Sequence, residues 1–180
     1  MKRWWQNRWW LYMLAAVALL GSGFYAYYRY TFPYGRSHHC SKLLSTALKM
    51  YALEHGGRYP AGESSPEASL SLLYPKYIAS AAIFSGKTLP GSPTVRRLES
   101  GQRLTPETCG WDYVEGLGED SDPRLMLLWD KVAGLGHNGQ RRSDGGREVV
   151  FVDHSAKYIH GPAWQALLAQ QEKLPASQTK

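Results

Sequence analysis

One apolar segment near the N-terminus limits what this chain can fold into more than any other feature. Residues 9–28 contain no charged side chain, and as a helix they would be about 30 Å long, which matches the hydrocarbon thickness of a bilayer. Aromatic rings stand at both ends of the segment, as they do at the two interfaces of membrane-spanning helices. The predicted interface anchors are Trp4, Trp5, Trp9, Trp10, Tyr27 and Tyr28. The segment therefore predicts one membrane-spanning helix in contact with lipid.

A cleaved signal peptide is the alternative interpretation of this segment. Its aliphatic core, residues 11–20, has signal-peptide length, and residues 21–23 are small enough to form a cleavage site. The orientation is the same in both interpretations, because Lys2, Arg3 and Arg8 precede the segment and no acidic residue does. We expect a single-pass protein of the bacterial inner membrane, with a cytoplasmic N-terminus and a periplasmic domain.

Length and composition allow one folded domain after the apolar segment. The chain has 180 residues, of which 43% are hydrophobic, and this is enough for one ordinary core. Pro33 and Gly35 interrupt any helix that would continue into the domain. The predicted parts are a cytoplasmic N-terminus at 1–8, the span at 9–28, a linker at 29–36, the exported domain at 37–174 and a polar tail at 175–180.

The positive charge of the chain does not predict nucleic-acid binding. The formal net charge is +6, but three of the 21 Lys and Arg residues lie before the apolar segment. The remaining 18 face 15 Asp and Glu residues and are spread along the chain, whereas a nucleic-acid footprint requires clustered basic side chains or a known reading motif. We expect the arginine pairs at 96–97 and 141–142 to be solvated surface.

The first helix of the domain is predicted from helical spacing of apolar residues. Ser37 is a suitable N-cap, and the glycine pair at 56–57 is a suitable stop. The predicted buried face consists of Cys40, Leu43, Leu44, Ala47, Leu48, Tyr51 and Ala52.

A second helix and an irregular segment are predicted next. Ser64 and Glu67 stand in capping-box relation, and the helix ends at Pro75. Residues 86–106 are rich in Gly, Pro, Ser and Arg and predict an irregular excursion, with one short strand at 94–98.

After residue 109 the pattern changes from helix to sheet. Four short runs rich in aromatic and β-branched residues, separated by turn-forming clusters, predict an antiparallel meander. In its last hairpin we expect a strand at 149–152, a turn at 153–156 and a return strand at 157–159. We also expect the Asp153 side chain to accept backbone N–H bonds in that turn.

A closing helix begins at Pro162 and places its apolar residues on one side. These residues are Trp164, Leu167, Leu168 and Gln171. The predicted fold class is therefore α+β: an N-terminal transmembrane helix, an amphipathic helix packed on a small C-terminal antiparallel sheet, and a short C-terminal helix.

The two cysteines, Cys40 and Cys109, leave two interpretations open. An exported domain tolerates disulfides, and a bridge between them would close a loop of nearly 70 residues, worth about 4 kcal/mol on the chain-entropy model. Two buried free thiols are the alternative. Neither cysteine has a partner at zinc-ligand spacing, so we expect no zinc site.

A cluster of histidines and acids raises the alternative of a metal-binding protein or a hydrolase. His137, Asp144, Asp153, His154 and His160 lie within 24 residues, and Ser155 completes the residue types of a hydrolytic triad. No pair stands at i,i+4 spacing, and adjacent strand residues point to opposite faces. The alternative function would use His137, Asp153 and His154.

Other chemical signals in the chain are weak. The acidic turns at 118–123 and 143–146 offer oxygen ligands that suit calcium, although such residues more often bond to their own backbone. The sequence contains no GxSxG elbow, no HExxH and no glycine-rich phosphate loop. We therefore expect no catalytic residue, no resident cofactor and no transition-metal ligand.

The order of these segments resembles type IV pilins and the pseudopilins of type II secretion. Four stretches carry the resemblance, at 40–60, 70–84, 109–117 and 125–159. The resemblance implies a pilin-like fold and a role in protein–protein contact, and some major pseudopilins bind calcium in the region of the acidic turns.

The sequence departs from that family at its processing site. Pilins carry a Gly, a Phe or Met and then a Glu at the start of the apolar segment, whereas Gly23-Phe24 lies at its end with no Glu behind it. His154 stands where relatives place a Gly, and residues 85–87 replace a frequent Cys-Pro. We expect an accessory or structural subunit of a larger membrane complex, either a secretion or pilus-like apparatus or a photosynthetic or respiratory complex that recruited the fold.

Overall fold

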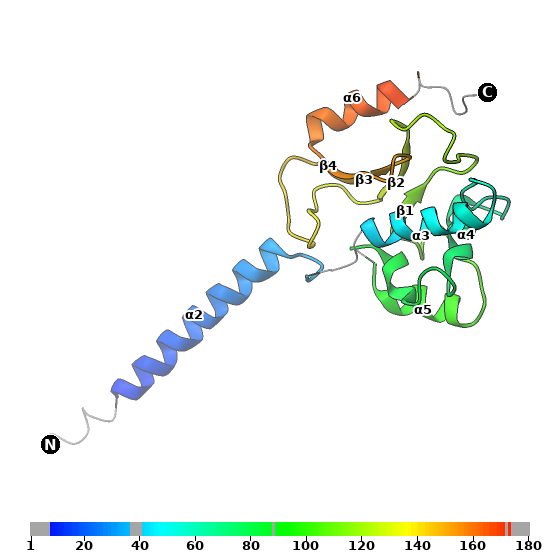
Figure 1. Cartoon of the computed structure of the whole chain (residues 1–180). Coiled ribbons are helices and arrows are strands. Elements are labelled where there is room, and N and C mark those ends of the chain that lie inside the picture. The colour runs from blue at the N-terminus through cyan, green and yellow to red at the C-terminus, as the bar shows by residue number, and fades with distance from the viewer. Residues whose placement is uncertain (1–7, 37–40, 88, 172, 174–180) are drawn as a thin grey trace, which may run out of the picture.

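The apolar segment forms one straight helix that stands apart from the folded domain (Figure 1). The computed structural model describes residues 8–36, 41–87, 89–171 and 173. Helix α2, Trp9–Thr31, includes the predicted span and continues three residues further. It ends at Thr31 with Phe32 as its C-cap, because Pro33 cannot extend it, so the first residues of the predicted linker are helical.

Helix α3, Ser41–Glu54, packs on the sheet with a face that differs partly from the prediction. Leu44, Ala47 and Leu48 are buried as expected, but Leu43 is 52% exposed. Ser41 and Ser45 are buried instead, because their hydroxyls bond to Glu148 and to the turn at His154. Ser37 and Cys40 lie outside the described residues.

The predicted capping box of the second helix is wrong by one residue. Helix α4, Pro66–Leu70, has Ser65 as its N-cap, and the Ser65 Oγ accepts a bond from the Ala68 amide at 3.2 Å. The Glu67 carboxylate turns instead to Lys131, 2.7 Å away. The 3-10 helix η1, Ser71–Leu73, continues α4, and a second 3-10 helix, η2, spans Ala81–Ser85.

The strand predicted at 94–98 is wrong, since these residues belong to helix α5, Gly91–Glu99. Thr94 and Leu98 are both buried, and their four-residue spacing brings them to the same face of a helix. The Thr94 hydroxyl donates to the Thr108 carbonyl at 2.7 Å, which fixes α5 to the loop before the sheet.

The predicted antiparallel meander is confirmed. Strands β1, Trp111–Tyr113, β2, Met126–Asp130, β3, Arg147–Phe151, and β4, Ala156–Ile159, pair in the order β1-β2-β3-β4. The last turn is shifted by one residue from the prediction, because β3 ends at Phe151 and β4 already begins at Ala156, which pairs with Val150.

Helices cover both faces of the sheet, with α3 and α4 on one side and α6, Gly161–Gln171, on the other (Figure 1). Successive side chains of β3 point to opposite faces of the sheet, so the core has two parts. Val150 packs on the α3 side, whereas Val149 and Phe151 pack with Trp164 of α6. The Gln171 side chain accepts the Met126 amide at 2.7 Å. The predicted docking of the closing helix is therefore confirmed.

Candidate functional site: an exposed apolar helix and its junction with the domain

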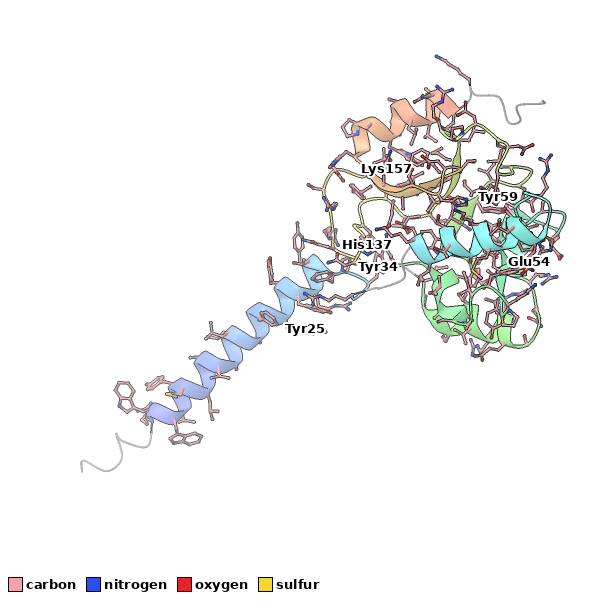
Figure 2. All side chains as sticks on the ribbon, viewed as in Figure 1. Tyr25, Tyr34, Glu54, Tyr59, His137 and Lys157 are labelled. Atoms are coloured by element: carbon pink, nitrogen blue, oxygen red, sulfur yellow. The ribbon has the colours of Figure 1, made fainter. Side chains whose placement is uncertain are left out.

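Helix α2 exposes its entire apolar surface. None of its residues is buried, and it is the one described helix that is long and apolar enough to cross a membrane. Trp9 is 73% exposed at its start, and Tyr27 is 68% exposed near its end. Figure 2 shows the Tyr25 ring on the same helix, in the half that leads to the domain. The helix is therefore a candidate membrane span by its length and composition.

The predicted interface anchors fall into three groups. Trp9, Trp10 and Tyr27 project from α2 as expected, whereas Tyr28 is half-buried against the Phe32 ring, 5.4 Å away between centroids. Trp4 and Trp5 lie outside the described residues.

Arg141 fastens the end of α2 to the domain. The last carbonyl groups of a helix have no partner within the helix. The Arg141 amide donates to the Thr31 carbonyl at 2.7 Å, and its Nε donates to the Tyr30 carbonyl at 3.0 Å. Its guanidinium lies 5.2 Å from the centroid of the Tyr30 ring. A cation at this position also interacts favourably with the negative end of the helix dipole.

The loop between β2 and β3 carries Arg141 from the sheet to α2 (Figure 1). Leu135 and Arg141 form an isolated antiparallel bridge, and the Gly136 amide donates to the Gln140 carbonyl at 2.8 Å. Gly139 adopts a φ of 80°, which closes the tip of the loop and favours glycine. Both residues of the arginine pair at 141–142 are exposed, as predicted, and each also lies over an aromatic ring, that of Tyr30 for Arg141 and that of Tyr158 for Arg142.

We expect Arg141→Ala to loosen the junction without unfolding the domain. The substitution removes one side-chain hydrogen bond and one cation–π contact, together worth about 1 kcal/mol at a partly exposed site. Hydrogen exchange followed by mass spectrometry should be about five-fold faster in peptides covering residues 28–34. Arg142→Ala is the matched control, and equal exchange in the two variants would contradict the assigned role.

A buried ion cluster lies close to this junction. The Lys87 side chain is 1% exposed, and its ammonium lies 2.7 Å from the Asp130 carboxylate and also bonds to the Glu148 carboxylate. The Ser41 hydroxyl donates to Glu148, and His137 Nδ1 lies 3.3 Å from the same carboxylate. The cluster joins the start of α3 to β2, β3 and the loop that reaches α2.

Two glycines allow Lys87 to reach this position. Gly86 has a φ of 62°, and its backbone lies against that of Gly110. A Cβ on Gly110 would lie 2.2 Å from the Ser85 carbonyl oxygen, which is impossible without moving the chain.

Burial raises the pKa of the Asp130 and Glu148 carboxyl groups, and Lys87 lowers the pKa of both. Burial raises the pKa of Asp130 to about 6, although Lys87 opposes the rise. Burial alone would also raise the pKa of Glu148, but Lys87, Ser41 and His137 outweigh it and lower that pKa. No local pattern in the sequence predicts this cluster, since Lys87 is 43 and 61 residues from its two partners.

The structure brings Asp144 and His160 of this cluster together, 2.6 Å apart, but separates His137, Asp153 and His154. His137 contacts Glu148, His154 lies between Ser45 and Tyr59, and Asp153 is exposed and bonds to the Ser155 amide at 2.8 Å. The described part of the chain contains no group of three His, Cys, Asp or Glu side chains that could hold a metal ion. The predicted bond from Asp153 to its own turn is confirmed, and the triad arrangement of Asp153, His154 and Ser155 does not form.

The acidic turns considered for calcium are engaged with protein groups. Asp122 binds the Arg124 side chain at 2.7 Å and the Arg124 amide at 2.9 Å. Asp144 accepts the Tyr158 hydroxyl at 2.5 Å and contacts His160 at 2.6 Å. These hydrogen bonds lower the pKa of both carboxyl groups to about 2.

Cys109 is fully buried and is a free thiol. Its Sγ donates weakly to the Trp111 carbonyl at 3.5 Å, and burial raises its pKa to about 12. The predicted partner, Cys40, lies outside the described residues, and no disulfide is found among the described ones, so Cys109 agrees with the free-thiol interpretation.

Comparison with protein families, curated proteins and solved structures gives no match for this chain.

Proposed function

We propose that this protein is a non-catalytic, single-pass membrane subunit whose domain acts by contact with other proteins. The observation that carries the proposal is α2, a 23-residue apolar helix with no buried residue that is bound to a folded domain through Arg141. A hydrophobic helix of this kind is stable only when lipid or protein covers it. In this proposal the N-terminus is cytoplasmic and the domain is exported into the periplasm.

The pilin-like identity rests on the order of elements. An apolar N-terminal helix, an amphipathic helix and a four-stranded antiparallel sheet follow one another as the resemblance implies. The turn after Thr31 separates α2 from the part of the chain that leads to α3, and the peptidase motif is missing from the apolar segment. Both differences favour an accessory or structural subunit over a subunit that polymerises by the usual route.

The outer face of α3 supports a role in protein contact. Leu43, Met50 and Leu53 lie on this helix and are 52%, 47% and 68% exposed. Their spacing of seven and three residues places them in one stripe along the helix. A helix of a partner subunit that packed on this stripe would bury all three side chains.

The test is purification of the full chain from its native membrane in a mild detergent. We expect the intact 20.3 kDa chain in stable stoichiometry with other subunits, and Leu43→Ser/Leu53→Ser should lose them while the domain stays folded. Val132→Ser is the matched control, since Val132 is an exposed apolar residue on the loop between β2 and β3.

Each outcome of this purification is informative. Secretion or pilus components would identify an accessory subunit of that apparatus, and photosynthetic or respiratory subunits would identify a recruited structural subunit. A chain that has lost its first 23 or so residues would support the cleaved signal peptide, and a lone monomer would contradict the proposal.

A further inference from the structure

A pocket of about 390 Å³ lies between α3 and the turn that joins β3 to β4. Its lining residues are Lys42, Ser45, Thr46, Lys49, His154, Ser155 and Ala156. All of them except Ala156 carry a side-chain nitrogen or hydroxyl group, and none of them is acidic. The polar groups of the lining are therefore amines, hydroxyls and an imidazole, set in a surface that is mostly apolar.

Helical spacing brings one wall of the pocket together. Lys42, Thr46 and Lys49 are separated by four and three residues, so they share one exposed face of α3. Neither lysine forms an ion pair with a carboxylate of the described residues. Two ammonium groups thus belong to one helix face beside the pocket.

The opposite wall is a turn with an uncommon backbone conformation. His154 has a φ of 63°, the left-handed region that costs a residue with a Cβ about 1 kcal/mol or more. Asp153 stabilises the turn by accepting the Ser155 amide at 2.8 Å. The Ser155 hydroxyl oxygen is enclosed in the turn beside the Asp153 carboxylate, and it helps to lower the pKa of that group.

The imidazole of His154 is held between two hydroxyl groups. Its Nδ1 lies 3.4 Å from the Ser45 Oγ, and its Nε2 lies 3.3 Å from the Tyr59 hydroxyl. The Tyr59 ring meets the imidazole edge-on at 5.9 Å between centroids. Burial lowers the pKa of His154 and Lys49 lowers it further, whereas Glu119 and Asp153 act in the opposite direction. The side chain is thus a neutral, fixed part of the wall.

We propose that this pocket binds an oxyanion, a phosphate or carboxylate group, with Lys42 and Lys49 supplying the charge. Hydrogen bonds from ammonium groups to oxyanions are short and strong. A bound anion would give the two lysines their counter-ion. The site is independent of the proposed membrane role, because its residues do not belong to α2 or to its junction.

The test is a titration of the full-length protein in nanodiscs of neutral phosphatidylcholine. Inorganic phosphate and acetate are added separately while the ring signals of ¹³C-labelled histidine are recorded, with the His154 signal assigned from His154→Gln. We expect a saturable shift of the His154 signal with phosphate, with acetate or with both. In Lys42→Gln/Lys49→Gln, two charge-assisted bonds are lost and the apparent Kd should rise about ten-fold or more.

Lys173→Gln is the control for a general loss of positive charge, because Lys173 does not line the pocket. A third arm replaces part of the neutral lipid with phosphatidylglycerol, with no added phosphate. A shift of His154 in that arm that disappears in the double-lysine variant would identify a lipid headgroup as the source of the oxyanion. If the shift does not saturate, or is equal in the wild type and the double-lysine variant, the proposal is wrong.

Discussion

Replacing Lys87 with methionine is expected to destabilise the folded domain by about 3–5 kcal/mol, because it leaves two buried carboxylates without their cation. Lys87 is the shared partner of Asp130 and Glu148, and the three side chains are at most 7% exposed. A methionine fills a similar volume, so the loss measures the missing charge more than a cavity. Denaturant unfolding of the full chain in mild detergent, followed by near-ultraviolet circular dichroism, gives the free energy of unfolding.

Two further variants make this expectation decisive. Lys76→Met removes a lysine from the exposed ion pair with Glu54 and should cost less than about 1 kcal/mol. The triple variant Lys87→Met/Asp130→Asn/Glu148→Gln removes all three charges and should recover a large part of the lost stability. An equal loss in Lys87→Met and Lys76→Met would show that the cluster contributes no more than a surface pair.

The stability lost in Lys87→Met should depend on pH, because the carboxyl groups of the cluster titrate. Burial raises the pKa of Asp130 to about 6, above its ordinary value of 3.8, so the stability contributed by its neutral form is present at low pH and is lost as pH rises through 6. The pKa of Glu148 is lowered, so its contribution is present near neutral pH and is lost in acid. Without Lys87 the pKa of both groups rises. The deficit of Lys87→Met should therefore be larger at pH 8 than at pH 5.

Patterns within one element predicted most of the fold correctly. The absence of charge between residues 9 and 28 identified α2, and short runs of aromatic and β-branched residues identified the four strands. These features are local, because each depends on the spacing of residues within one segment.

The wrong predictions concern positions where distant contacts decide. Thr94 and Val95 favour a strand by propensity, but burial of Thr94 together with Leu98 selects the helix. Leu43 has a spacing that suits the core but is exposed, and Ser45 is buried instead because its hydroxyl bonds to His154. That partner lies 109 residues further along the chain, so the spacing within the helix could not predict the contact.

The candidate site was predicted only in part, because its contacts also join residues that are far apart in the sequence. The apolar helix was evident from the sequence, but its fastening by Arg141 was not, because 111 residues separate Arg141 from Tyr30. The cluster of His137, Asp153 and His154 was misleading, since neighbours in the sequence point into different environments when a strand ends and a turn begins.

Placing two arginines in the middle of α2 should have the largest effect on where the protein resides. Val17 and Leu20 lie near the centre of the helix and are 64% and 75% exposed, so Val17→Arg/Leu20→Arg changes no contact within the domain. Each arginine at the centre of a spanning helix costs about 2.5–3.5 kcal/mol on insertion scales, or about 6 kcal/mol for the pair.

Extraction of isolated membranes with alkaline carbonate separates integral proteins from peripheral ones and measures this effect. We expect the wild type and the control Val17→Ile/Leu20→Met to stay in the membrane pellet, and the double-arginine variant to appear in the soluble fraction or to be degraded. Because partner subunits that hold the domain only from outside are stripped by carbonate, they cannot retain the variant. A double-arginine variant that pellets like the wild type would mean that α2 is not the membrane anchor, and the exposed apolar surface of the helix would then have to be covered by protein.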